Sequence, residues 1–393
     1  MHETIPLFDP DITAEDEEAV ARVLRQRRLG LGDVVREFEA AFAARIARPY
    51  AIGVGSLGTG LRIALTACGI GAGHEVVLPA FAPVVLANAV VFTGAKPVFV
   101  DVDPRTLTMD PAAVEPLVTE RTRAVLVHVC FGNPTHLEGL GRLCQKFEVA
   151  MIEHATEALG SRVGRDHVGR FGRLSVFGLP NGGPFAGPVC GGDSAVLATH
   201  DDTLADACRS LRDAGRPYVD PEDGVPLVMG RLLEHERIGF DSRMDDLRAA
   251  LALSQSLRLD RTIQRRREIA EEYVRRLGGI ADLILPTLPE PSMASWSGFV
   301  VRLAEVFGID DRDLIIRGLH RHEIGASNPY PVAPLLPFHA CRWGSRAGDF
   351  PVAERMAQRT IALPFHHGLT SRDIDLVCQT LELMIKRQAF RRT

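Results

Sequence analysis

Short apolar runs alternate with longer amphipathic segments through the first half of the chain. The runs are largely apolar, four to six residues long, and lie at residues 51–54, 75–78, 97–101, 124–129 and 149–153. Runs of this length, bounded by loop residues, predict buried strands. Regular alternation of such strands with helical segments predicts a mostly parallel sheet covered by helices on both faces. The fold class is therefore expected to be α/β.

Helical patterns precede and separate these runs. Thr13 stands shortly before a run of four acidic residues, as expected at a capped helix start. Phe38, Phe42 and Ile46 recur at fourfold spacing and predict a second amphipathic helix. Residues 83–93 are apolar but too few to span a membrane, so we expect a buried helix there.

The last part of the chain has a different pattern. Residues 244–277 predict one long helix, apolar in its first half and charged in its second half. We expect this helix to join a large α/β domain, residues 1–243, to a smaller C-terminal α+β domain, residues 244–393. Within the small domain the pattern predicts a strand at 299–303 and helices at 312–320, 352–359 and 372–386.

Candidate binding residues follow the predicted strands. Ligands on parallel sheets lie beyond the carboxyl ends of the strands. Ser56 follows the first strand in a glycine-rich loop, His128 stands at the end of the fourth, and Glu153 and His154 end the fifth. We therefore expect these side chains to face a common site.

Composition excludes several classes of function. The net charge of −5 and the absence of a basic stripe argue against a nucleic-acid partner. The seven cysteines form no CxxC pair and are odd in number, which indicates a reduced, cytoplasmic protein. The first residues lack the apolar core of a signal peptide, and no uncharged stretch is long enough to cross a membrane.

Lysine is nearly absent from the chain. The three lysines are Lys96, Lys146 and Lys386, and arginine supplies almost all other positive charge. Between Lys146 and Lys386 there is consequently no side-chain amine that could form an imine with a carbonyl compound.

Six stretches together resemble the DegT/DnrJ/EryC1/StrS family, the sugar aminotransferases of fold type I. They read GLGDVVREFEAAFAARI, GAGHEVVLPAFAPVVLANAVVFTGAKPVFVDVDP, AVLVHVCFGNPTHLEGL, VAMIEHATEALGS, GFDSRMDDLRAALALSQ and FPVAERMAQRTIALPFHHGLT. The resemblance covers roughly residues 5–385 and implies an aspartate-aminotransferase-like fold. It also implies a homodimer whose subunits share their active sites.

The resemblance implies a pyridoxal phosphate site from which this chain departs. The family holds the cofactor as a Schiff base on lysine, with a carboxylate at its ring nitrogen and hydroxyls at its phosphate. Residues 176–184 contain no lysine, the expected aspartate is His154, and the glutamine three residues on is Glu157. The phosphate loop keeps Ser56 and Gly58 but lacks the expected threonine. Other changed positions are Pro83 for an aromatic, Gly178 for a serine and Asp241 for the asparagine of the neighbouring subunit.

Because the scaffold positions remain while the cofactor positions change, we expect a repurposed enzyme that uses no cofactor. His154, Glu157 and Asp241 are the expected catalytic residues, since a histidine between carboxylates is suited to proton transfer. The expected reaction is dehydration, isomerisation or cyclisation of a small polar metabolite derived from a sugar or amino acid. Substrate contacts are expected from Ser56, Gly58, His128, Glu153, Asn181 and Tyr330.

Several alternatives stay open from the sequence. The chain could be a non-catalytic partner of a paralogous aminotransferase, or bind pyridoxal or pyridoxamine phosphate without a tether. His154 could merely hydrogen-bond a strand end. No metal is expected, although His154, Glu157 and Asp241 are acceptable ligand types.

Two further sites are interpreted as structural. Cys190, in a glycine-rich loop, is expected to be a buried inert thiol rather than a nucleophile. His366 and His367 are expected to be solvent-exposed.

Overall fold

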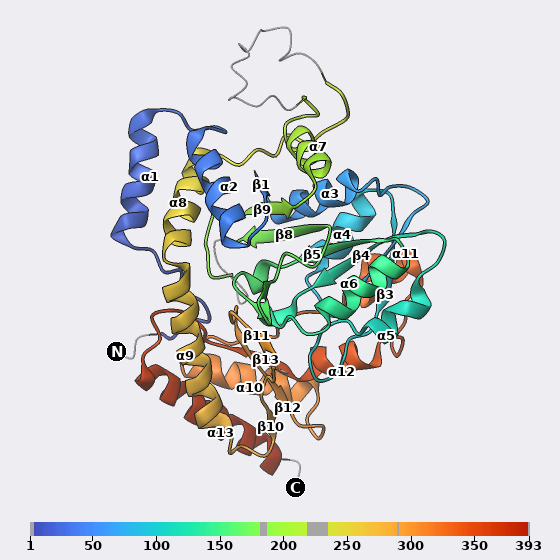
Figure 1. The fold of residues 1–393 in the computed structure, drawn as a ribbon. Coiled ribbons are helices and arrows are strands. Elements are labelled where there is room, and N and C mark those ends of the chain that lie inside the picture. The colour runs from blue at the N-terminus through green and yellow to red at the C-terminus, as the bar shows by residue number, and fades with distance from the viewer. Residues whose placement is uncertain (1–3, 181–186, 218–234, 289–290, 392–393) are drawn as a thin grey trace.

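The computed structural model describes residues 4–180, 187–217, 235–288 and 291–391. A seven-stranded sheet forms the centre of the large part of the molecule (Figure 1), with strand order β1-β9-β8-β5-β4-β2-β3. Strand β9 is antiparallel to β1 and β8, and the other neighbouring strands are parallel. The predicted α/β class with a mostly parallel sheet is confirmed. The strands are β1 Tyr50–Val54, β2 Glu75–Pro79, β3 Lys96–Val100, β4 Thr122–His128, β5 Ala150–His154, β8 Leu174–Leu179 and β9 Ser194–Thr199.

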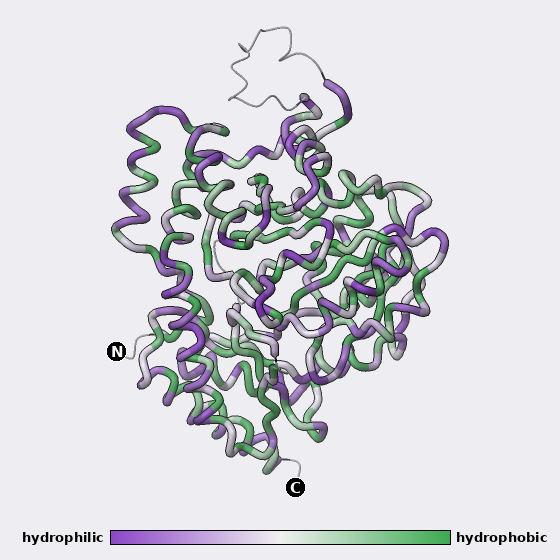
Figure 2. Tube along the Cα trace, viewed as in Figure 1, coloured by the Kyte–Doolittle hydropathy of each residue, from purple (hydrophilic) through white to green (hydrophobic). Residues whose placement is uncertain are grey.

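Helices cover both faces of this sheet, and apolar residues concentrate along its strands (Figure 2). Successive strand residues point to opposite faces, so Val127 packs with Phe38 and Phe42, whereas Leu126 packs with Leu61 on the other side. The helices are α1 Ala14–Gln26, α2 Asp33–Arg45, α3 Leu57–Ala67, α4 Val84–Phe92, α5 Pro111–Val114, α6 Leu137–Lys146 and α7 Asp202–Arg212. Short 3₁₀ turns lie at η1 Glu115–Leu117, η2 Cys130–Gly132 and η3 Thr156–Ala158. The buried helix predicted at 83–93 is confirmed as α4.

The C-terminal part has its own core. Strands β10 Leu283–Ile284, β12 Phe299–Leu303 and β13 Thr360–Leu363 form an antiparallel sheet. Around it lie α9 Leu259–Leu277, α10 Ile309–Arg321, α12 Pro351–Arg359 and α13 Ser371–Phe390, whereas η6 Ala333–Leu335 and α11 Pro337–Trp343 pack on the large part of the molecule near β2, β3 and α4 (Figure 1). A third small sheet contains β6 Arg162–Val163, β7 Asp166–His167 and β11 Ser292–Met293, joining segments from both halves of the chain.

The start of the chain packs on this C-terminal part. The Ile5 amide donates to the Glu323 carbonyl at 2.9 Å, and the Gly325 amide donates to the Ile5 carbonyl at 2.8 Å. Ile5 is also buried in the C-terminal core. The expected boundary after residue 243 stays a prediction, but the first residues contact the smaller part rather than only the larger one.

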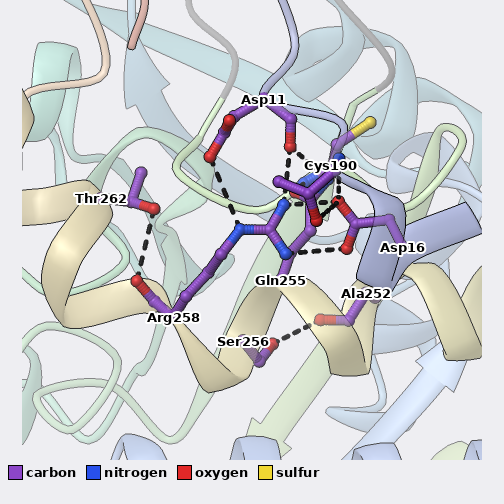
Figure 3. Close-up of polar contacts among 9 residues, drawn as sticks. Asp11, Asp16, Cys190, Ala252, Gln255, Ser256, Arg258 and Thr262 are labelled. Atoms are coloured by element: carbon purple, nitrogen blue, oxygen red, sulfur yellow. Dashed lines mark hydrogen bonds and ion pairs between the residues drawn. The ribbon is translucent and has the colours of Figure 1, made fainter. Parts of the chain in front are cut away.

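The single helix predicted over 244–277 is wrong in one respect, because it is two helices. Helix α8 Asp246–Leu257 and helix α9 meet at Arg258, whose backbone φ of −106° and ψ of 13° leave the helical region. The Arg258 side chain reaches the N-terminal segment, where its Nη1 atom donates to Asp16 Oδ1 at 2.8 Å (Figure 3). Its Nη2 atom donates to the Asp11 carbonyl at 2.6 Å.

Asp16 is the buried end of this contact. It caps α1 by accepting from the Thr13 amide at 2.9 Å, and only 1% of its surface is exposed. Burial by itself raises the pKa of Asp16, but hydrogen bonds from Arg258, Ser254 and Thr13 outweigh this and lower it. The ion pair therefore fixes the N-terminal helix onto the break between α8 and α9.

We predict that Asp16→Asn destabilises the protein. Breaking a fully buried ion pair costs about 3–5 kcal/mol, and because Arg258 keeps some exposure we expect about 2 kcal/mol at neutral pH. A carboxylate whose pKa is lowered by folding adds to the free energy of unfolding at any pH above its pKa in the unfolded chain, near 3.9. This stabilisation is lost as the pH falls through the pKa of the folded protein. The difference between wild type and variant should therefore shrink below about pH 4, as measured by urea unfolding.

Glu17→Gln is the matched control, because Glu17 is an exposed residue of the same helix turn. Its effect should stay within about 0.5 kcal/mol. Equal stabilities of Asp16→Asn and wild type at neutral pH would contradict a structural role for the pair.

Candidate functional site

Two histidines meet at the carboxyl ends of neighbouring strands. In the parallel pairing of β4 with β5, His128 lies opposite His154. Their Nδ1 atoms are 2.9 Å apart and their rings are stacked, with centroids 5.0 Å apart. Each is 1% exposed. Strand register alone therefore places two imidazoles in contact in the protein interior.

A buried carboxylate lies beside them. Glu157 is in η3, directly after β5, and its Oε2 atom accepts from the Phe131 amide at 2.5 Å. Its Oε1 atom accepts from the Tyr330 hydroxyl and lies 3.6 Å from His128 Nε2. Tyr330 comes from the loop before η6, and its ring stacks on Phe131 with centroids 5.6 Å apart. The carboxyl group thus joins the large and C-terminal parts of the chain.

Thr156 closes the other end of the row. Its Oγ1 atom accepts from the Gly178 amide at 2.8 Å and lies 2.8 Å from His154 Nε2. If the threonine hydroxyl donates to His154, then His154 donates through Nδ1 to His128, and His128 carries its proton on Nε2, facing Glu157. In that arrangement each of these donors has an acceptor or faces one. We call His128, His154, Thr156, Glu157 and Tyr330 the polar cluster.

Burial keeps the polar cluster uncharged near neutral pH. It raises the pKa of Glu157 to about 8, although hydrogen bonds from Tyr330 and Phe131 act in the opposite direction. It lowers the pKa of His154 to about 3, and burial together with His154 lowers that of His128 well below its usual value. Charges buried in a medium of low dielectric are costly, so neutral forms are favoured.

Four predicted site residues are brought together by this geometry: His128, His154, Glu157 and Tyr330. Their assignment to catalysis or substrate binding stays a prediction. The alternative in which His154 merely hydrogen-bonds a strand end is correct in that His154 lies at the end of β5 and contacts Thr156 and His128. His128 in turn faces the carboxyl group of Glu157.

Glu153 does not join them, which corrects the expected convergence. It is adjacent to His154 on β5 and therefore points to the opposite face of the sheet. There its carboxylate accepts from the amides of Gly169 at 2.8 Å and Gly172 at 2.6 Å. Glu153 orders the loop before β8.

Asp241 also lies outside the polar cluster in the single chain. Its side chain is 78% exposed and pairs with Arg243 at 2.6 Å. The expected convergence of Asp241 with His154 is therefore not found within one chain. A role for Asp241 in the site of a neighbouring subunit stays a prediction.

The phosphate-loop positions form a helix start. Ser56 caps α3 by accepting from the Thr59 amide at 3.2 Å, and its hydroxyl donates to Thr59 Oγ1 at 3.0 Å. A threonine hydroxyl is therefore present beside Ser56, one residue beyond Gly58. Asn181 lies outside the described residues.

Of the two sites interpreted as structural, Cys190 is as expected and His366 is not. Cys190 is buried, its amide donates to Gln255 at 2.8 Å (Figure 3), and burial raises the pKa of its thiol, as expected for an inert cysteine. His366 is 6% exposed, so the expectation of two solvent-exposed histidines is wrong for that residue, and His367 is only partly exposed. His366 is buried where the chain leaves β13.

Two residues of the site were missed from the sequence. Thr156 gave no signal because a single hydroxyl has no diagnostic spacing. Cys130 stands two residues after His128, and the chain turns sharply there, with φ of 52° at Phe131 and 82° at Gly132. The His-x-Cys spacing at a strand end was the available signal.

A pocket lies next to the polar cluster. Cys130 and Phe131 form part of its wall, and Arg105, Asn133, Trp296 and Arg302 contribute polar and aromatic surface. The space inside it is small, about 50 Å³. Glu157 does not line the pocket, but its carboxyl group accepts from the amide of Phe131, which does.

Comparisons with known proteins agree with the fold. The chain matches the DegT/DnrJ/EryC1/StrS aminotransferase family over residues 10–382. It is 30% identical over 384 residues to the spore coat polysaccharide biosynthesis protein SpsC of Bacillus subtilis, covering 97% of each chain. It is 32% identical over 355 residues to a dTDP-3-amino-3,4,6-trideoxy-alpha-D-glucose transaminase of Streptomyces venezuelae, covering 90% of this chain and 88% of the relative.

Solved structures give the same result. The aminotransferase TlmJ from Streptoalloteichus hindustanus superposes with a TM-score of 0.88 and 29% identity, covering 98% of this chain and 100% of the other. DesV from S. venezuelae, solved with a ketimine intermediate, superposes with a TM-score of 0.86 and 30% identity. The match covers 97% of this chain and 98% of DesV. Among the described residues, no helix is both long and apolar enough to cross a membrane.

The prediction that no cofactor is used is contradicted by these matches. The family consists of aminotransferases, the S. venezuelae relative is a transaminase, and DesV holds a ketimine intermediate. Amino transfer of this kind is pyridoxal phosphate chemistry. The expectation drawn from the changed residues was therefore wrong in treating their loss as loss of the cofactor.

The residues of this chain nevertheless do not fit a lysine-held cofactor. Lys96 pairs with Glu75 at the amino end of β3, at the sheet edge opposite the polar cluster. Lys146 and Lys386 have exposed side chains, and each pairs with a glutamate. His154 is neutral and hydrogen-bonded on both ring nitrogens, so it is not the carboxylate that a pyridinium needs. No reaction step is therefore derived through this group.

We predict that Glu157→Gln changes the pH dependence of stability. Folding raises the pKa of Glu157 from 4.5 to about 8. The protonated carboxyl group therefore stabilises the fold fully below pH 4.5, and this stabilisation is lost as the pH rises through about 8. Wild type should lose on the order of a few kcal/mol between about pH 5 and pH 8. Glutamine has no proton to lose, so the variant should gain relative stability at alkaline pH.

Urea unfolding of both proteins at about pH 6 and pH 9, in buffer containing EDTA, measures this difference. A stability difference that is the same at both pH values would show that Glu157 is not a buried, protonated carboxyl group.

Proposed function

The chain belongs to the DegT/DnrJ/EryC1/StrS aminotransferase family, and from this we propose that it acts on a small sugar-derived metabolite by proton transfer at the polar cluster. The family match covers most of the chain. The names of relatives place them in polysaccharide and deoxysugar biosynthesis. A keto-sugar linked to a nucleotide is the proposed substrate class, in a pathway of secondary metabolism, and a cytoplasmic location is proposed with it.

The observation that supports proton transfer is the row of close polar groups from Tyr330 to Thr156, in which every step except that between Glu157 and His128 is within hydrogen-bond distance. Tyr330 donates to Glu157, Glu157 lies 3.6 Å from His128, and His128 contacts His154. Each member of this row can give or accept a proton when its neighbour does the opposite. If Glu157 gives up or takes a proton, its neighbours in the row can return it to its starting protonation state, so that no unpaired charge stays in the interior.

The proposed roles follow from position. Glu157 is nearest the pocket wall and would exchange a proton with the substrate. His128 and His154 would return that proton along the row, and Tyr330 would orient the carboxyl group. Dehydration and isomerisation of a keto-sugar need a proton removed from carbon and one delivered to oxygen, and cyclisation needs a proton moved from a hydroxyl to a carbonyl oxygen; one carboxyl group with a relay can supply either transfer.

A second candidate function also has a specific observation behind it. The polar cluster is enclosed, since His128, His154, Glu157 and Tyr330 are each at most 6% exposed. An enclosed site is expected of a non-catalytic partner that completes an active paralogous aminotransferase. In either case we propose a twofold dimer, in which the exposed Asp241 would be placed to face the other subunit.

We predict that Glu157→Gln and His154→Ala each lower turnover by about 10²- to 10⁴-fold, the usual contribution of a positioned acid or base. The assay incubates nucleotide-linked keto-sugars in D₂O and follows deuterium at carbon by mass spectrometry. It is run with and without pyridoxal or pyridoxamine phosphate and glutamate. Glu138→Gln, an exposed carboxylate of the same part of the chain, is the control and should keep full activity.

Three outcomes separate the possibilities. Activity that survives both changes at the polar cluster would end the proton-transfer assignment. Formation of an amino-sugar with consumption of glutamate would show transamination instead. Turnover that requires an added paralogous aminotransferase would establish the partner function.

A further inference from the structure

Three buried side chains of different elements place metal-ligating atoms together. One ligand atom each from His128, Cys130 and Glu157 lies within 4.8 Å of the others, and all three residues are fully buried. Among the residues that the structure describes, none hydrogen-bonds His128 Nε2, although this atom is buried and lies 3.6 Å from Glu157 Oε1. A buried imidazole nitrogen without a partner is costly unless something binds it.

We propose that His128, Cys130 and Glu157 form a binding site for a thiophilic divalent cation such as Zn²⁺. This differs from the set considered from sequence, because Cys130 takes part and Asp241 and His154 do not. The proposal rests on the position of these three side chains and holds whether or not the proton-transfer function is correct.

The donor set matches zinc in type and number. Imidazole nitrogen, thiolate sulfur and carboxylate oxygen are the three ligand classes that zinc takes in proteins, and three protein ligands leave one position open. In a tetrahedral zinc site the nitrogen and oxygen ligands are about 3.3 Å apart. The observed 3.6 Å between His128 Nε2 and Glu157 Oε1 is close to this. The Cys130 ligand atom lies within 4.8 Å of both.

The surrounding hydrogen bonds would hold the ligands in place. Ligating imidazoles usually bond through their second ring nitrogen, and His128 Nδ1 already lies 2.9 Å from His154 Nδ1. Glu157 is held by Tyr330 and by the Phe131 amide. The η2 turn, with its left-handed residues Phe131 and Gly132, directs both Cys130 and that amide toward the same place.

Charge favours a divalent cation over a monovalent one. A thiolate and a carboxylate together carry two negative charges, and a divalent cation cancels both. The loaded site is then neutral as a whole, which matters because an uncompensated charge in the interior is costly. Calcium and magnesium are disfavoured because they select oxygen ligands rather than sulfur.

The proposed site adjoins the pocket. Cys130 is both a proposed ligand and part of the wall of the pocket. The open fourth position would therefore be filled by water or by a group entering from that side. A bound cation would occupy Glu157 Oε1, so metal binding and proton transfer by Glu157 exclude one another. If both proposals hold, Zn²⁺ inhibits turnover.

The test is direct binding of Zn²⁺ and Co²⁺ to the full chain without an affinity tag. The background variant carries Cys341→Ser, because Cys341 is the exposed cysteine. Competition with a chromophoric chelator should give tight binding of one Zn²⁺ per chain. Co²⁺ should produce the thiolate charge-transfer band in the near ultraviolet and the intense visible bands of a tetrahedral site.

Variants at the three ligands should each weaken Zn²⁺ binding by at least about 100-fold, more than the 10- to 100-fold typical of residues behind the ligands. These are His128→Ala, Cys130→Ala and the nearly isosteric Glu157→Gln, which guards against misfolding as the cause. Circular dichroism melting confirms that each variant is folded. Cys130→Ala should also abolish the charge-transfer band.

Two matched controls should bind Zn²⁺ like the background variant. Cys144→Ala removes another buried thiol, and His136→Ala removes the histidine of a second group, with Asp103 and Asp110, whose ligand atoms are similarly close. Equal affinity of Cys130→Ala and the background, or loss of binding only in His136→Ala, would overturn the proposal. Activity plays no part in this readout, so failure here leaves the proton-transfer test independent.

Discussion

The parallel register of β4 and β5 is the constraint on which the site depends. Once His128 and His154 end neighbouring strands at the same level, their imidazoles must meet on one face of the sheet. Both rings are buried, so each ring nitrogen needs a hydrogen-bond partner within the interior. Thr156 and Glu157, which follow β5 in a tight turn, are the nearest groups able to supply one. The polar cluster is thus a consequence of burying two histidines side by side.

Burial also decides the electrical character of the site. A lone ionised group there would lose most of its hydration without gaining compensating interactions with the protein, so neutral forms dominate. Neutral groups bind one another through hydrogen bonds that are individually modest but costly to leave unmade. This makes the row cooperative, since removing one member leaves its neighbours unsatisfied. It also connects the two parts of the molecule, because Tyr330 reaches Glu157 from beyond β12 and α10.

Five strands of the large sheet and β12 could be predicted to within about two residues because short apolar runs between loops carry a strong local signal, but β9 and β13 were not predicted. The meeting of His128, His154, Glu157 and Tyr330 was also accessible, from the rule for strand ends and from the resemblance. Glu153 was misplaced because nearness to a strand end was used without the alternation of strand faces. The break at Arg258 could not be predicted, since it depends on Asp11 and Asp16, which are distant in sequence. Asp241 could not be placed because a single chain does not contain the neighbouring surface.

The changes at the cofactor positions are not independent of one another. His154 Nε2 needs a hydrogen-bond partner, and Thr156 provides it while accepting from the Gly178 amide. A Cβ atom at Gly178 would come within 3.0 Å of Thr156 Oγ1, so a serine at that position would crowd the threonine that the histidine requires. His154, Thr156 and glycine at 178 therefore form one compatible set. Restoring a lysine between residues 176 and 184 would supply an amine, but His154 would still offer a neutral ring where a carboxylate is needed. Recovering transamination through a lysine imine would require the whole set to change together.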